Sequence, residues 1–148
     1  MKGMHAGLCG VAALLWSAST LAASVTPQFL EGNINSCAAA GWSGPGVSTN
    51  TVPIDGQAYA LDDNGNTVTF QFNPPGQDKL IDWSATIPLD LVVIKGGSNA
   101  NGFYYVPPAM SDTGLFAPDN DSGGPAGVSH AVACFTYRLT VTKTADTA

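Results

Sequence analysis

The fold is decided by the stretch Asp62-Asp63-Asn64-Gly65-Asn66-Thr67-Val68-Thr69-Phe70-Gln71-Phe72-Asn73. From residue 67 onward, apolar and polar side chains alternate, so that Val68, Phe70 and Phe72 fall on one face of an extended chain. The preceding Asn64-Gly65 pair favours a tight turn, because both residues tolerate a positive φ. We therefore predict a β-hairpin with strands over residues 57–61 and 67–73.

Further strands are expected on the C-terminal side of this hairpin. Pro88 separates two of them, over residues 80–85 and 89–95, and the unbroken apolar run within the second predicts a central strand covered on both faces. The others are a short aromatic strand over 102–106, closed by Pro107-Pro108, and a last strand over 130–143, with a long loop over 109–128 between them. The apolar positions of the last strand change phase near Cys134, which predicts a bulge or a switch between sheets.

Helix signals are scarce in this chain of 148 residues, which contains 17 glycines and 10 prolines. We allow one helical turn, over residues 36–40, where Ser36 can cap the turn before Gly41 ends it. Several short strands separated by turn residues are typical of antiparallel β-sandwiches. We therefore predict an all-β, jelly-roll-like sandwich in a single domain.

The first residues predict export. Lys2 precedes an apolar run over residues 6–16, which is too short to span a bilayer, and small residues then lead to Ala23. We place signal-peptide cleavage after Ala23, so that residues 1–23 are removed and residues 24–148 form the domain. A lipoprotein signal at Cys9 is disfavoured, because Leu8 precedes it where a small residue is required. The domain is expected to be secreted, extracellular or periplasmic, and not to insert in a membrane after cleavage.

Cleavage also changes the cysteine count and the charge. Of three cysteines, Cys9 leaves with the signal peptide, and Cys37 and Cys134 remain as a pair that can form a disulfide in an oxidising compartment. Loss of Lys2 changes the net charge of the chain from −6 to about −7. Such an acidic domain lacks the clustered cations that nucleic acids and anionic membranes require.

Two short motifs are similar to protease signatures. Asp121-Ser122-Gly123-Gly124-Pro125 copies most of the sequence around the trypsin-like nucleophile, but that serine needs a preceding histidine, and His130, the histidine left in the domain, follows it. Asp112-Thr113-Gly114 matches the aspartic-protease triplet, but residues 107–111 before it include two prolines and do not read as a strand. We predict that the protein is not an enzyme.

Binding residues are weaker signals. Two clusters, over residues 62–66 and 119–121, offer oxygen ligands for calcium, but without EF-hand spacing, so hydrogen-bonded turns are the favoured interpretation. We predict no metal site and no cofactor. A binding surface is conceivable at Tyr104 and Tyr105, beside Asn99 and Asn101, although adjacent strand residues point to opposite faces, so that at most one tyrosine faces a ligand.

Several segments match a known pattern in order and spacing. They are Val93-Ile94-Lys95-Gly96-Gly97-Ser98-Asn99-Ala100-Asn101, Tyr104-Tyr105, Ser111-Asp112-Thr113-Gly114-Leu115-Phe116-Ala117-Pro118, Gly127-Val128-Ser129-His130 and Cys134-Phe135. Together they resemble a module of bacterial secreted and surface proteins to which no catalytic activity is attached. The chain departs from that pattern at Phe116, where the module has histidine. The resemblance implies that Asp112 and Ser122 both lie in the module's long loop.

The C-terminal residues 139–146 are similar to the entry to repeat domains of bacterial surface proteins. We expect a secreted, non-catalytic module that is structural or adhesive at a bacterial cell surface, with a surface protein or polysaccharide as its unidentified partner. The alternatives are a calcium- or glycan-binding module and, less favoured, a small hydrolase that uses Ser122 or Asp112.

Overall fold

The computed structural model describes residues 23–139, which form seven β-strands and no helix. The predicted signal peptide up to Ala22 and residues 140–143 of the last predicted strand lie outside the described residues. No helix in the described part of the chain is long and apolar enough to cross a membrane. The prediction of an all-β fold is confirmed.

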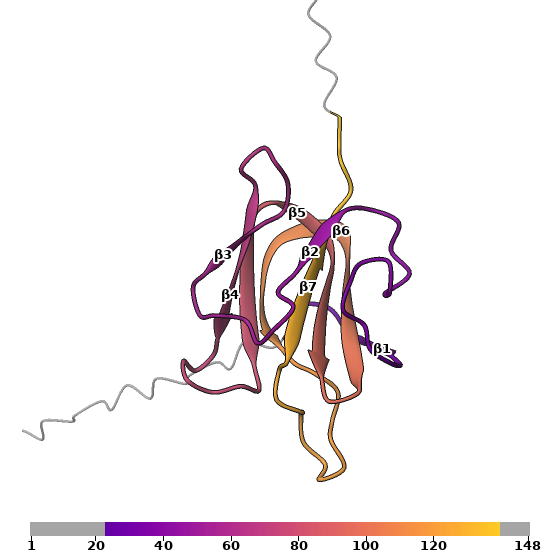
Figure 1. The fold of residues 1–148 in the computed structure, drawn as a ribbon, viewed down its shortest axis with the longest axis vertical. Helices are drawn as coiled ribbons and strands as arrows, with labels where there is room; N and C mark the ends of the chain where they lie inside the picture. Colours follow the sequence, from indigo (N-terminus) through magenta and orange to yellow (C-terminus); the bar gives the residue numbers. More distant parts are fainter. Residues whose placement is uncertain (1–22, 140–148) are drawn as a thin grey trace, which may run out of the picture.

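The strands are antiparallel and hydrogen bond in one sheet of order β1-β6-β5-β4-β3, in which β7 pairs with β5 and β2 pairs with β7 (Figure 1). Their bounds are β1 Gln28–Leu30, β2 Gly46–Ser48, β3 Ala58–Ala60, β4 Thr67–Phe72, β5 Ile81–Gly96, β6 Asn99–Leu115 and β7 His130–Cys134. The jelly-roll-like sandwich remains a prediction.

The hairpin predicted from residues 57–73 is confirmed. Tyr59 of β3 lies opposite Val68 of β4, and the turn between them is closed by a hydrogen bond of 2.8 Å from the Leu61 N–H to the Asn66 carbonyl. Val68 and Phe70 are fully buried, whereas Gln71 is exposed. The alternation of the sequence therefore sets which face of β4 enters the core.

The prediction that Pro88 separates two strands is wrong. Pro88 lies inside the 16-residue strand β5. The pairing of β5 with β6 shifts register between Ser84 and Leu89 and again between Leu89 and Leu91. Because the ladder is already irregular there, the missing N–H of a proline is tolerated within the strand. A further shift lies between Ile81 and Trp83, so the pairing of β5 is interrupted several times without ending the strand.

The prolines at 107–108 likewise do not end a strand, contrary to the prediction that they close the strand over residues 102–106. β6 is 17 residues long and continues through them to Leu115, facing the irregular part of β5. Asp112 pairs with Trp83 in the ladder and so lies in a strand, not in a long loop as predicted. The loop between β6 and β7 contains only residues 116–129, Ser122 among them.

β5 and β6 form a long hairpin with two unlike halves. The turn half, residues 91–96 and 99–104, is next to the tight turn at 97–98, and β7 adds to its β5 edge. The far half, residues 81–89 and 105–115, has β4 on its β5 edge instead. Figure 1 shows β3 and β4 at the left of the molecule, β2 and β7 across its middle and β1 at its right.

One core joins the two halves, and a second covers the outside of the turn half. Val92 and Ile94 share the larger cluster with Phe70 of β4, whereas Leu91 and Val93 belong to a smaller cluster on the opposite face. All four residues 91–94 are fully buried, which confirms the prediction of a central strand covered on both faces.

The last strand is shorter than predicted. β7 ends at Cys134, and residues 135–139 are not in a strand. Cys134 pairs with Leu91 of β5, beside the register shift between Leu89 and Leu91, and with Gly46, the first residue of β2. In the described residues, β7 therefore ends where β2 begins and where the β5 ladder becomes irregular, although the sequence beyond Cys134 continues to alternate.

Candidate functional site

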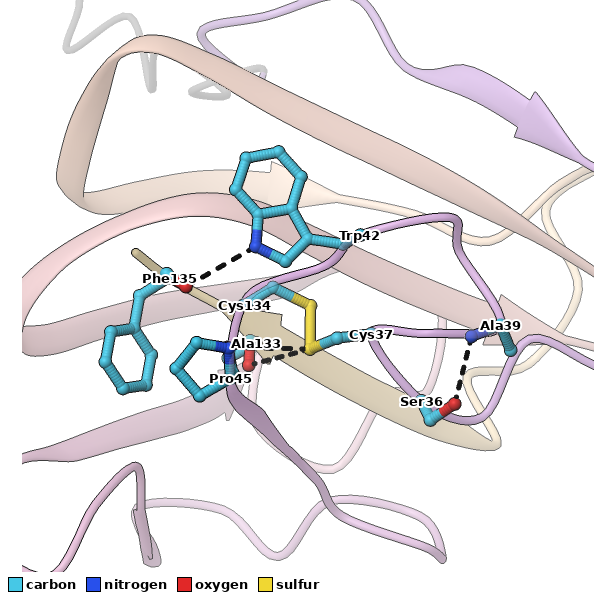
Figure 2. Close-up of a disulfide and its surroundings, with 8 residues drawn as sticks. All are labelled: Ser36, Cys37, Ala39, Trp42, Pro45, Ala133, Cys134 and Phe135. Atoms are coloured by element: carbon cyan, nitrogen blue, oxygen red, sulfur yellow. Dashed lines mark hydrogen bonds between the residues drawn. A yellow bond between two sulfur atoms is a disulfide. The ribbon is translucent and has the colours of Figure 1, made fainter. Parts of the chain in front are cut away.

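The predicted disulfide between Cys37 and Cys134 is present, with its Cα atoms 5.8 Å apart and a sequence separation of 97 positions. Figure 2 shows it linking the segment before β2 to the end of β7. Both cysteines are buried, at 8% and 0% exposure, and pack with Leu91 and Val93 in the smaller core. The bond therefore fastens the N-terminal segment to the central strands.

The surroundings of the disulfide are close-packed. Trp42 Nε1 donates a hydrogen bond of 3.4 Å to the Phe135 carbonyl, and Ser36 Oγ accepts one of 3.1 Å from the Ala39 N–H (Figure 2). The predicted helical turn at 36–40 is thus a hydrogen-bonded turn that Ser36 caps. At Gly46 a Cβ atom would collide with the Ala133 carbonyl and with Cys37 Sγ, so a side chain is excluded there.

The four residues of the predicted binding surface do not form one surface, and that prediction is corrected. Tyr105 and Asn101 are buried, at 3% and 6% exposure, and the Asn101 amide donates to the Phe116 carbonyl at 3.1 Å. Asn99 Oδ1 accepts a hydrogen bond of 3.0 Å from the Gly32 N–H. Tyr104 packs against the smaller core on the opposite face from Tyr105. These side chains hold the fold together.

A buried polar chain links the two strands of the far half to the N-terminal segment. Trp83 Nε1 donates to the Tyr105 hydroxyl at 3.1 Å, and that hydroxyl donates to Asp112 Oδ2 at 3.0 Å. Burial raises the pKa of Tyr105, so that it remains a neutral donor. The Asp112 carboxylate also accepts hydrogen bonds from the Ser24 N–H at 2.9 and 3.1 Å and from Ser24 Oγ at 3.1 Å.

The hydrogen bonds of this buried polar chain explain why Asp112 is not placed like the acid of an aspartic protease. Asp112 is 7% exposed. Its carboxylate oxygens accept hydrogen bonds from Ser24, from Tyr105 and from the Thr113 N–H, the last at 2.9 Å. A depression of about 150 Å³ beside it is lined mainly by β4 and β5 residues, among them Thr69, Gln71, Asp82 and Ser84. The aspartate acts as an acceptor at the junction of three segments.

The serine of the other protease-like motif is a turn residue. Ser122 Oγ donates to Asn120 Oδ1 at 2.6 Å, and the Ser122 N–H donates to the same oxygen at 3.1 Å. The His130 ring is hydrogen bonded instead to Ser129 Oγ, through Nδ1, at 3.1 Å. The geometry gives Ser122 a structural role in closing the loop between β6 and β7.

The acidic turn over residues 62–66 is satisfied internally. Asp62 accepts two backbone N–H groups, from Asn64 at 2.9 Å and from Asn66 at 3.1 Å, and the Asn66 side-chain amide at 2.8 Å. The Asn66 amide, followed by these backbone donors, lowers the pKa of Asp62. Among residues 23–139, no three His, Cys, Asp or Glu side chains are grouped to hold a metal ion.

An exposed depression that sequence reasoning missed lies between β1 and the start of the β6–β7 loop. It measures about 410 Å³ and is lined by Pro27, Phe29, Asn101, Phe116, Pro118 and Asp119. Phe29 is 61% exposed, and the Phe116 ring packs edge-on against Phe103 at 5.9 Å. The one signal in the sequence was Phe116, which stands where the resembled module has histidine.

No family model, curated protein or solved structure matches the chain. The resemblance to a bacterial surface module is therefore supported only by the motifs quoted above.

Proposed function

We propose that the chain is exported and that residues 24–148 act outside the cytoplasm as a non-catalytic, disulfide-linked β-sandwich module, structural or adhesive at a bacterial cell surface. The observation that carries the proposal is the buried bond between Cys37 and Cys134. Disulfides of this kind form and persist in oxidising compartments, which agrees with the export signal in residues 1–23.

Expression of the full chain in a Gram-negative host tests the export. We expect the protein in the periplasmic fraction, lacking Cys9, and with no thiol that reacts with an alkylating agent under denaturing conditions until a reductant is added. A matched variant with Lys2 and the apolar run over residues 6–16 deleted is expected to stay in the cytoplasm with reactive thiols. A full-length, reduced protein in the cytoplasm from the unaltered gene would contradict the proposal.

The depression around Phe29 supports the adhesive role and favours a glycan as the ligand class. An exposed aromatic ring beside the exposed Asp119 offers an apolar face and a polar group together, the combination that sugar rings require. It replaces the four-residue surface that the sequence predicted.

A glycan array tests this ligand class. We expect the exported protein to bind a polysaccharide, and Phe29→Ala to weaken binding about tenfold or more, as loss of an aromatic anchor does. Val106→Ala is the matched control, because Val106 is 94% exposed and does not line the depression. Equal loss in both variants, or binding that survives Phe29→Ala, would place the ligand elsewhere.

The rival interpretation is a hydrolase that uses Ser122 or Asp112. The turn contacts of Ser122 and the internal partners of Asp112 argue against it. Hydrolysis of a generic protein substrate that Ser122→Ala or Asp112→Ala abolishes would overturn the non-catalytic proposal.

A further inference from the structure

The N-terminal segment meets the core at a buried negative charge. Asp112 is 7% exposed and lies in β6 next to Tyr105, which remains neutral, and near Asp82, whose carboxylate accepts the Gly114 N–H at 2.7 Å. The β4 residues that line the adjoining depression, Thr69 and Gln71, are neutral as well. A carboxylate buried without a cation is costly unless another charge compensates it.

No described cationic side chain supplies that charge. Arg138 pairs with Asp90 at 2.6 Å, Lys79 lies 3.8 Å from Asp78, and Lys95 Nζ donates to the Gly97 carbonyl at 2.7 Å. The group that does reach the carboxylate is the backbone nitrogen of Ser24, which is 2.9 Å from Oδ1 and 3.1 Å from Oδ2. An amine with a positive charge at this position would face both carboxylate oxygens, so that its hydrogen bonds would be charge-assisted.

Ser24 is also the first residue after the predicted cleavage position. We propose that hydrolysis of the Ala23–Ser24 peptide bond converts the Ser24 amide nitrogen into an α-ammonium group, which forms an ion pair with the Asp112 carboxylate. Water adds across the bond: its oxygen joins the Ala23 carbonyl carbon, so that the leader leaves with a carboxylate, and its two protons go to the Ser24 nitrogen, which with its own hydrogen becomes an ammonium group. The inference rests on the proposed export, because export is what removes residues 1–23.

Processing then couples to folding. The ion pair fixes the start of a segment that packs Val25 against the larger core and adds β1 to β6 beside Asn101. An uncleaved chain retains an uncharged amide at Ser24 and gains only a hydrogen bond there. The uncleaved chain would thus lack the stabilisation of an ion pair at Ser24, and the mature N-terminus would supply it.

Mass spectrometry and unfolding of the exported protein test the proposal. We expect an N-terminus at Ser24 and, after acetylation selective for that α-amine, an unfolding equilibrium constant about tenfold larger, because the acetyl group removes the charge and keeps one N–H. The same acetylation is expected to change the constant less than about twofold in Asp112→Asn.

The pH dependence supplies a second readout, which does not need Asp112→Asn to fold. Asp112 raises the affinity of the folded state for the proton of the α-amine, so the stabilisation is complete below about pH 8, the pKa region of a free α-amine, and is lost as the amine deprotonates at higher pH. The acetylated protein should lack that alkaline loss.

Each result decides a different point. An exported protein that begins at another residue, or whose stability does not respond to acetylation, overturns the ion pair and leaves the proposed export intact. Retention of the full chain in the cytoplasm overturns the export. In that case a chain beginning at Ser24 can be refolded with its disulfide, and the effect of acetylation on its stability still decides whether the ion pair forms.

Discussion

The two halves of the β5–β6 hairpin are held by different forces. In the turn half, residues 91–94 are fully buried, and the disulfide lies behind them. In the far half the ladder is irregular, and Trp83, Tyr105 and Asp112 are joined by hydrogen bonds. Apolar packing without direction holds a regular ladder, whereas the half with shifted register depends on directional polar contacts.

This difference shows where the fold tolerates change. A strand covered on both faces loses stability when a side chain is shortened, because a cavity remains. A polar chain loses stability when one atom is removed, because a buried partner is left without its hydrogen bond. The following predictions test the comparison, from the largest expected effect to the smallest.

Removal of the disulfide should have the largest effect. We expect Cys37→Ser with Cys134→Ser to lower the free energy of unfolding by about 4 kcal/mol, because a closed loop of this length constrains the unfolded chain strongly. Urea denaturation measures the change, and reduction of the unaltered protein serves as its control. A loss below about 1 kcal/mol would show that the turn half does not depend on the bond.

Truncation of the strand between the two cores comes next. Leu91→Ala should cost about 3 kcal/mol, because Leu91 is fully buried and the cavity would lie beside Cys134. Thr86→Ala, on the exposed surface of the far half of the same strand, is the control and should cost far less. Equal losses in guanidinium denaturation would mean that the halves are not distinct.

Removal of a single oxygen atom tests the hydrogen-bonded polar chain of the far half. Tyr105→Phe should cost about 2 kcal/mol, because it leaves Trp83 Nε1 without an acceptor and Asp112 with one donor fewer. Tyr104→Phe, on the opposite face of the turn half, should change the free energy of unfolding by less than about 0.5 kcal/mol. If both variants lose the same amount, the hydrogen-bonded chain is not what holds the far half.

The smallest effect is an acid response of the β3–β4 turn. The Asn66 amide and the backbone N–H groups lower the pKa of Asp62, so its contribution is present above the pKa of the unfolded chain and is lost as pH falls through the lower folded value. NMR titration should place the Asp62 midpoint below 3.8, with the Asn66 amide shifting in parallel. The amides of residues 91–94 should not move. A midpoint above 3.8 would contradict the turn contacts.

Local patterns predicted the parts of the fold that depend on neighbours in sequence. The alternation in 67–72 gave the buried face of β4, the Asn64-Gly65 pair gave the turn, and the apolar run at 91–94 gave a central strand. The predicted removal of Cys9 left a pair of cysteines, which predicted the disulfide. The prolines led to wrong strand boundaries. A proline destabilises a strand only where the partner strand would accept a hydrogen bond from its missing N–H, and the shifted register decides whether it would.

The candidate site could not be predicted in the same way. Phe29 is exposed because it belongs to the short edge strand β1, and it lines one depression with Phe116 only because β1 pairs with β6 near Asn101. Tyr105 seemed available for a ligand, but the strand carries it into the core. Exposure of an aromatic side chain depends on what the rest of the chain lays over it.

The sequence by itself determined the all-β class, the hairpin, the two-faced burial of residues 91–94 and the pair of cysteines, because each depends on periodicity or on counting. Only the tertiary structure decided that β5 and β6 continue through their prolines, that Asp112 lies in a strand, and that its carboxylate faces the nitrogen of Ser24. The contact between Ser24 and Asp112 joins residues 88 positions apart, and no local pattern specifies which distant groups will meet.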